Sequence, residues 1–197
     1  MDGAKSVTFD IVSSKTAFTV TIPSYGHHLA LMALPAAIVG NLLGLTDGEI
    51  SRGLSKYSPV GGRANVIDTG YITVINDCYN ANPTSVKAAL TSLGSLNGRR
   101  VAILGGMNEL GHQSNELHRE TGIYAAESGL ELLISCGEKA KFINDGYLSA
   151  GGISARHFDV KSELIAALSG LIEKGDNVLV KASHSMGFDE IVDLLQS

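Results

Sequence analysis

From residue 64 onward, short apolar segments alternate with amphipathic ones, and this alternation limits the possible folds more than any other feature. Two of the apolar segments, residues 101–104 and 178–180, contain no polar residue, as expected of parallel strands that are covered on both faces. Strands that alternate with helices predict an α/β fold with a right-handed, doubly wound parallel sheet. Ligands of such sheets bind beyond the carboxyl ends of the strands, so functional residues are expected in the loops there.

The hydrophobic pattern places both the strands and the helices of this region. The predicted strands are residues 65–68, 71–76, 101–105, 131–136, 156–158 and 177–182. The clearest helix has apolar residues at helical spacing from Leu164 to Ile172 and is expected to end at Gly175.

Residues 1–62 show a different pattern. Alternating apolar and polar residues at 7–11 and 18–22 predict a hairpin, and an apolar helix is expected over 28–43. Thr46 and Glu49 match a capping box that starts a second helix. The segment 58–62 breaks the pattern, so we predict two domains, 1–62 and 63–197. Because the first helix is apolar around its circumference, we expect self-association through residues 1–62.

Composition and charge exclude several classes of protein. With 44% hydrophobic residues and a net charge of −5, the chain is not disordered and is not expected to bind nucleic acid or an anionic membrane. Two cysteines do not make a disulfide framework, which favours free thiols in a reducing compartment. The longest apolar stretch, residues 29–45, is too short to cross a bilayer, and no secretory signal opens the chain. We therefore expect a cytoplasmic protein.

The first candidate loop, residues 77–83, follows the predicted strand 71–76. Asn82 and Pro83 are explained by the start of a helix, where they suit the cap and the first helical position. The cap does not explain Asp77, Tyr79 and Asn80, which would suit a ribose or a phosphate beside a helix N-terminus. From the residues alone, a ligand-binding role and a structural role are equally supported.

Two further loops follow strands of the same sheet. In residues 105–111, Glu109 would either orient a substrate amine or be a solvated acid in a tight turn, and the glycine spacing does not match a dinucleotide fingerprint. In residues 181–186, Lys181 ends an apolar strand and Ser183 suits a helix cap. His184 is not part of a Ser-His-Asp order or a G-x-S-x-G motif, so it does not indicate a hydrolase. The remaining histidines have no acidic partners at metal spacing, so no metal site is expected.

These motifs occur together, and in this order, in one known family. Along the chain they read G-H-H before an alanine-rich helix, G-G-R, N-D-C-Y-N-A-N-P-T-S, L-G-G-M-N-E-L-G with H-R-E-T-G, and V-L-V-K-A-S-H-S-M. The chain resembles the C-terminal part of the Mur ligases. Within that family, Y-N-A-N-P and M-N-E-L-G favour the members that add D-Ala-D-Ala to UDP-MurNAc-tripeptide in peptidoglycan synthesis.

The resemblance implies an ATP-dependent, amide-forming ligase that works through an acyl phosphate. ATP and Mg²⁺ would be bound mainly by regions absent from this sequence, and UDP-MurNAc-tripeptide and D-Ala-D-Ala would be the substrates. Residues 1–62 would be the C-terminal remnant of a central ATP-binding domain, and residues 63–197 a Rossmann-like C-terminal domain.

By motif position, the resemblance also assigns roles to individual residues. The nucleotide-binding residues would be Arg63, Asp77, Tyr79, Asn80, Asn82 and His28. The substrate-binding residues would be Met107, Glu109, Gly111, Lys181, Ser183 and His184.

The sequence also departs from the family's usual pattern. Gly106 replaces an Asp, His184 replaces an Arg, and Leu29 and Met32 replace asparagines. These departures support an alternative, a noncatalytic binding or interaction module on a Rossmann-like sheet.

We predict that the 197-residue chain alone neither hydrolyses ATP nor joins D-Ala-D-Ala to the nucleotide tripeptide. The sequence contains no G-x-x-x-x-G-K-[ST] loop, and phosphoryl transfer depends on such positioning and charge neutralisation. Nucleotide binding should be millimolar, or about −4 kcal/mol. Calorimetry and a phosphate-release assay test both statements. Phosphate release that increases with D-Ala-D-Ala would contradict the first, and micromolar ATP binding the second.

Overall fold

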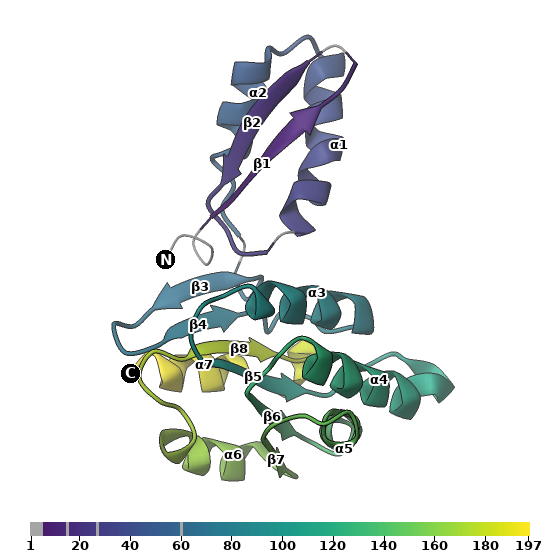
Figure 1. Ribbon diagram of the computed structural model, residues 1–197, viewed down its shortest axis with the longest axis vertical. Coiled ribbons are helices and arrows are strands. Elements are labelled where there is room, and N and C mark those ends of the chain that lie inside the picture. Colours follow the sequence, from purple (N-terminus) through teal and green to yellow (C-terminus); the bar gives the residue numbers. More distant parts are fainter. Residues whose placement is uncertain (1–5, 15, 27, 60) are drawn as a thin grey trace. The chain divides into compact units, whose positions relative to one another are not determined.

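The computed structural model describes residues 6–14, 16–26, 28–59 and 61–197. The chain divides into two compact units, Met1–Val60 and Gly61–Ser197 (Figure 1). No helix within the described ranges is long and apolar enough to cross a membrane.

The first unit is a hairpin covered by two helices. Strands β1 (Val7–Val12) and β2 (Ala17–Ile22) pair antiparallel, and helices α1 (His28–Leu42) and α2 (Asp47–Leu54) follow, as the sequence predicts. The predicted capping box is present, because Thr46 N donates to Glu49 Oε2 at 2.8 Å and Glu49 N donates to Thr46 Oγ1 at 3.3 Å. The core of this unit consists of Ile11, Val20, Ile22, Leu29, Ala33, Ala37 and Ile50.

Helix α1 buries only one side against this core. Five of its large apolar side chains are each more than half exposed: Leu31, Met32, Ile38, Val39 and Leu42. We call these residues the apolar face of α1. An exposed apolar patch of this kind normally marks a contact with another molecule or another part of the same protein.

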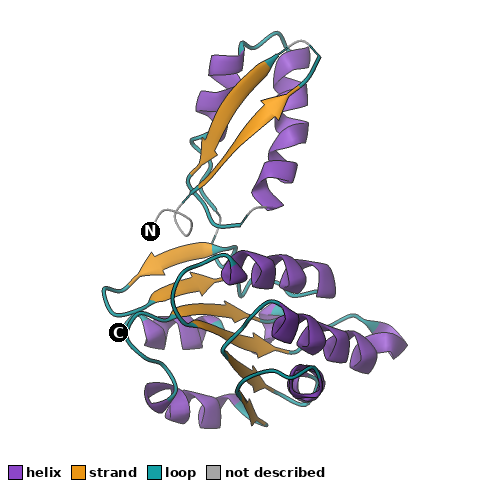
Figure 2. Ribbon diagram, in the orientation of Figure 1, coloured by secondary structure: helices purple, strands orange, loops and turns teal. Residues whose placement is uncertain are grey.

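The second unit is built on a six-stranded sheet in the order β3-β4-β8-β5-β6-β7 (Figure 2). The strands are β3 (Asn65–Asp68), β4 (Thr73–Asn76), β5 (Arg100–Gly105), β6 (Leu132–Cys136), β7 (Ala155–Phe158) and β8 (Asn177–Lys181). Strands β4 to β8 are parallel, which confirms the predicted Rossmann-like sheet.

Strand β3 is an exception, because it runs antiparallel to β4 at the sheet edge. Thr69 N donates to Ile72 O at 3.0 Å, and Thr69 Oγ1 accepts from Tyr71 N and Ile72 N. This tight turn is too short for the crossover that a parallel pair requires. It also explains why β4 begins at Thr73 and not at Tyr71, where the sequence pattern started the strand.

Helices cover both faces of the sheet (Figure 1). Helices α3 (Pro83–Gly94), α4 (Ser114–Glu127) and α5 (Ala140–Ser149) lie on one face, and α6 (Lys161–Ala167) and α7 (Asp189–Leu195) lie on the other. The face changes because the chain reverses direction across the sheet between β7 and β8, so that a right-handed crossover places α6 on the opposite side.

Helix α6 is shorter than the sequence predicts. It ends at Ala167 and a 3₁₀ turn, Leu168–Gly170, follows, whereas the apolar spacing suggested one helix through Ile172. Leu171 N donates to Leu168 O at 3.0 Å, and Arg99 Nη2 donates to Leu171 O at 3.3 Å. Arg99 thus binds a carbonyl group at the point where the chain turns toward β8.

We predict that the 197-residue chain self-associates through the apolar face of α1, because each large apolar side chain left in water forfeits roughly 1.5–3 kcal/mol. Sedimentation should show dimers or larger species, and Ile38→Lys combined with Leu42→Lys should yield a monomer. Asn41→Lys, an exposed polar position on the same helix, is the matched control and should leave the association intact. A monomeric wild-type chain would contradict the prediction.

Candidate functional site

The carboxyl ends of β4 and β8 are joined by an ion pair between the buried Lys181 and the half-buried Asp77. Lys181 is only 2% exposed, and its Nζ lies 2.5 Å from Asp77 Oδ2 and donates to Asn80 O at 2.8 Å. The parallel register that pairs Asn76 with Val180 brings these ends side by side. Removing one partner of such a pair leaves an uncompensated charge, so the pair holds both loops in place.

Asp77 also anchors the segment that enters this unit. Its Oδ1 accepts from Ala64 N at 3.2 Å, and Tyr79 N donates to Gly62 O at 2.9 Å. Gly62 has a φ of +70°, and a Cβ there would lie 3.3 Å from Tyr79 N. The G-G-R motif is therefore folded directly against the 77–83 loop.

Arg63 and two aromatic rings form an exposed group above this anchor. The guanidinium carbon of Arg63 lies 3.7 Å from the ring centroid of Tyr79, and the His184 ring centroid lies 5.7 Å from the same ring. A cation–π contact at an exposed site contributes about 0.5–1 kcal/mol. The contact holds the guanidinium in one place while its N–H groups remain accessible, and this arrangement suits an anionic ligand.

The structure shows a helix cap at Asn82, as its position in the sequence predicts. Ser85 N donates to Asn82 Oδ1 at 2.8 Å, Asn82 N donates to Ser85 Oγ at 3.1 Å, and Pro83 occupies the first helical position of α3. The side chain of Asn80 accepts from Ala81 N at 2.8 Å. Both asparagines are exposed.

The third loop, residues 106–111, follows β5, which is the other neighbour of β8 in the sheet. We call it the 106–111 turn. Met107 is buried, whereas Glu109 and Gly111 are exposed. Glu109 has a φ of +63°, a left-handed conformation that is uncommon for a residue with a side chain. The exposed carboxylate is available to a cationic group such as an amine.

Both cysteines are free and buried. Burial, together with the nearby Asp189 and Asp77 carboxylates, raises the pKa of Cys78 to about 12. Burial also raises the pKa of Cys136. Thiols with raised pKa values are not nucleophiles at neutral pH, so neither cysteine is a candidate for covalent catalysis.

The structure thus brings the candidate residues of the second unit to the adjacent carboxyl ends of β4, β8 and β5. His28 is the exception, since it begins α1 in the first unit and its side chain lies outside the described part of the chain. Sequence reasoning missed His118 and Met186, which contact the 106–111 turn, and Asn108, a residue of the turn that contacts Ser183. Two sequence signals point to His118: it opens the H-R-E-T-G motif, and it stands four residues after Ser114, which aligns the two on one helix face.

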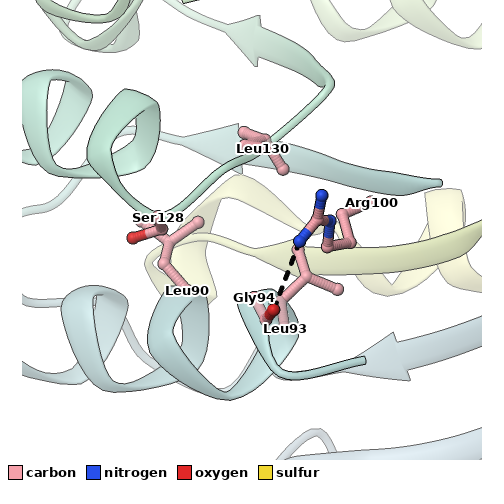
Figure 3. Close-up of a pocket in the computed structure, with 6 residues that line it drawn as sticks. All are labelled: Leu90, Leu93, Gly94, Arg100, Ser128 and Leu130. Atoms are coloured by element: carbon pink, nitrogen blue, oxygen red, sulfur yellow. Dashed lines mark hydrogen bonds between the residues drawn. The ribbon is translucent and has the colours of Figure 1, made fainter. Parts of the chain in front are cut away.

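Neither a metal cluster nor the small pocket drawn in Figure 3 competes with this site. Across the described ranges, no group of three or more His, Cys, Asp and Glu side chains could hold a metal ion. The pocket in Figure 3 has no room for a water molecule, and it is lined by Leu90, Leu93, Gly94, Arg100, Ser128 and Leu130. Arg100 donates there to Gly94 O at 3.2 Å, a contact with the C-terminus of α3.

Comparison with known proteins gives a consistent result. A family model described as "Mur ligase, glutamate ligase domain" matches residues 62–184. The UDP-N-acetylmuramoyl-tripeptide–D-alanyl-D-alanine ligase of Bacillus subtilis is 34% identical over 91% of this chain and 40% of its own length. The counterparts from Haemophilus influenzae and Escherichia coli are each 32% identical. The chain spans about 40% of the length of these relatives.

Solved structures agree with the sequence relatives. A crystal structure of MurF from Acinetobacter baumannii matches with a TM-score of 0.88 and 28% identity, over 98% of this chain and 43% of that one. MurF from Thermotoga maritima in complex with ADP matches with a TM-score of 0.81 and 25% identity, over the same shares of the two chains.

We predict that Lys181→Met lowers the free energy of unfolding by about 3 kcal/mol, because it leaves the Asp77 carboxylate without its cation. Urea denaturation followed by circular dichroism measures the change. Lys174→Met, at an exposed position, is the matched control and should change stability by less than about 0.5 kcal/mol. Adding Asp77→Asn to Lys181→Met should restore part of the loss. Equal stability of the two lysine variants would show that the ion pair contributes nothing.

Proposed function

This chain belongs to the Mur ligase family, and we propose that it forms the C-terminal part of an ATP-dependent ligase that joins D-Ala-D-Ala to UDP-MurNAc-tripeptide. The observation that carries the proposal is that the family's separate motifs lie together at the carboxyl ends of β4, β8 and β5. Arg63, Tyr79 and Lys181 come from three distant segments, yet they lie within one connected set of contacts. The relatives named for this reaction support the choice of substrates.

The nucleotide side of the proposed site consists of Arg63 and the 77–83 loop. The exposed guanidinium over the Tyr79 ring fits a phosphate group, and the exposed Asn80 and Asn82 side chains fit a ribose or a phosphate oxygen. The ADP complex of a similar protein supports a nucleotide as the ligand. When bound, ATP would supply the phosphoryl group that activates the tripeptide carboxylate.

Magnesium is assigned to no residue of this chain. Within the described ranges, carboxylates do not gather into a group that could hold a metal ion. As in the family that the chain resembles, Mg²⁺ would be held mainly by residues outside this sequence.

The amine side of the proposed site is the 106–111 turn together with residues 181–184. The exposed Glu109 carboxylate would bind the ammonium group of the dipeptide. The exposed His184, which lies beside Tyr79, would contact the incoming dipeptide. Lys181 is buried and bonded to Asp77, so its proposed role is to hold the two loops beside the substrate. Ser183 is also buried.

Residues 1–62 fit the remnant of a central ATP-binding domain, and residues 63–197 the C-terminal domain. The apolar face of α1 supports this division, because that face would pack against the rest of the central domain. We place the reaction in the cytoplasm, where ATP and UDP-linked precursors are present.

A noncatalytic binding or interaction module is the second candidate function, because Gly106 and His184 replace an Asp and an Arg that are usual in the family. A Cβ at residue 106 would lie 3.3 Å from Lys139 Cβ and 3.9 Å from His118 Nε2. An Asp at position 106, which is usual in the family, would therefore place its side chain against Lys139 and His118. The reading frame upstream of Met1 separates the two functions, because a phosphate-binding loop encoded there would support the ligase.

The proposed function is tested by titrating the ¹⁵N-labelled chain with ADP and, separately, with D-Ala-D-Ala. We expect ADP to shift the amide signals of residues 61–64 and 77–82, and the dipeptide to shift those of 106–111 and 183–186. Arg63→Gln should weaken the ADP response by roughly tenfold, the factor expected for about 1.4 kcal/mol. Arg156→Gln, an exposed arginine on β7, is the matched control. Shifts confined to other regions would refute the proposed site.

A further inference from the structure

Three consecutive backbone amides at the start of the 106–111 turn are bound by side chains of distant residues. Gly106 N donates to Met186 Sδ at 2.9 Å, Met107 N to His118 Nε2 at 2.8 Å, and Asn108 N to Ser183 Oγ at 2.8 Å. Met186 and Ser183 follow β8, whereas His118 lies on α4. The turn is therefore held from two separate elements at once.

The contacts of His118 determine its protonation state. A backbone N–H can only donate, so Nε2 must be the acceptor, and the proton lies on Nδ1, which is 2.6 Å from Ser114 O. The ring is completely buried. Burial lowers the pKa of His118, and the positive charge of Lys139 lowers it further, while the hydrogen bond to Ser114 acts in the opposite direction. The imidazole is consequently neutral at pH 7.

Ser183 completes the arrangement from the other side. Its N donates to Gly106 O at 3.1 Å while its Oγ accepts from Asn108 N, so it bridges two positions of the turn. Asn108 Nδ2 also donates to Ser185 Oγ at 2.9 Å. The residue that follows Asn108 is the exposed Glu109, which has a left-handed φ of +63°.

We propose that His118 and Ser183 are positioning residues that clamp the 106–111 turn and so fix the Glu109 carboxylate for the amine of the incoming substrate. The clamp consists of the bonds from Met107 N to His118 and from Asn108 N to Ser183. The identity of the amine rests on the proposed function, whereas the clamp itself does not. The bond from Met107 N is buried, so this amide has no water to replace a lost acceptor and should be held strongly, whereas the bond from Asn108 N is partly buried and should be held less strongly.

Hydrogen exchange of the ¹⁵N-labelled 197-residue chain tests the clamp. In the wild type, Met107 and Asn108 amides should exchange slowly, and His118 should show the Nδ1–H tautomer in its ring nitrogen shifts. His118→Leu should speed exchange at Met107 by roughly tenfold or more, the factor expected for one lost hydrogen bond. His118→Gln, which keeps an acceptor, should restore protection at Met107. Ser183→Ala should speed exchange at Asn108 and leave Met107 protected.

The exposed His112 provides the matched control, since His112→Leu should change neither amide. Fast exchange at Met107 in the wild type, or the Nε2–H tautomer, would overturn the clamp. If His118→Leu fails to fold, the wild-type tautomer and the Ser183→Ala pattern still decide the question.

A D-Ala-D-Ala titration of the same variants tests the link to the substrate. We expect His118→Leu to weaken the dipeptide response of the turn by tenfold or more and His118→Gln to preserve it. Equal dipeptide affinity in His118→Leu and wild type would overturn the positioning role. Protected amides in a chain that does not respond to the dipeptide would support the clamp and refute the proposed function, so the two failures are distinguishable.

Discussion

The buried ion pair between Lys181 and Asp77 is the interaction on which the candidate site depends. A cation that is 2% exposed requires a charged partner, and Asp77 provides it where the ends of β4 and β8 lie side by side. Because Asp77 also accepts from Ala64 N, the same carboxylate holds the segment that enters the second unit. One pair of charges thus connects three parts of the chain.

This arrangement separates two cations by their roles. Lys181 is bound by Asp77 and Asn80 within the protein. Arg63, in contrast, packs against the Tyr79 ring and is exposed to solvent. The 106–111 turn shows the same division, with buried groups that hold the backbone and an exposed carboxylate at Glu109. The loops at the carboxyl ends of the strands therefore present the positive Arg63 and the negative Glu109 to solvent. These charges suit a phosphate and an amine, respectively.

The first unit has a different physical character. Its core is small, and the apolar face of α1 remains uncovered. The relatives are about two and a half times as long as the matched region, since the chain spans about 40% of their length. The apolar face of α1 is the observation on which we propose that residues 1–62 belong to a larger domain.

The fold class, most strand positions, the Thr46 and Asn82 caps, and the loops that contain the candidate residues could all be predicted from the amino-acid sequence. These features depend on hydrophobic period and on contacts over three or four residues, which are visible in a linear chain. The direction of β3, the early end of α6, the burial of Lys181 and the contact of His118 with Met107 N became visible only in the folded chain. Lys181 and Asp77 are 104 positions apart, and Ser183 and Asn108 are 75 apart. No local pattern specifies such partners, because the crossovers of the sheet bring them together.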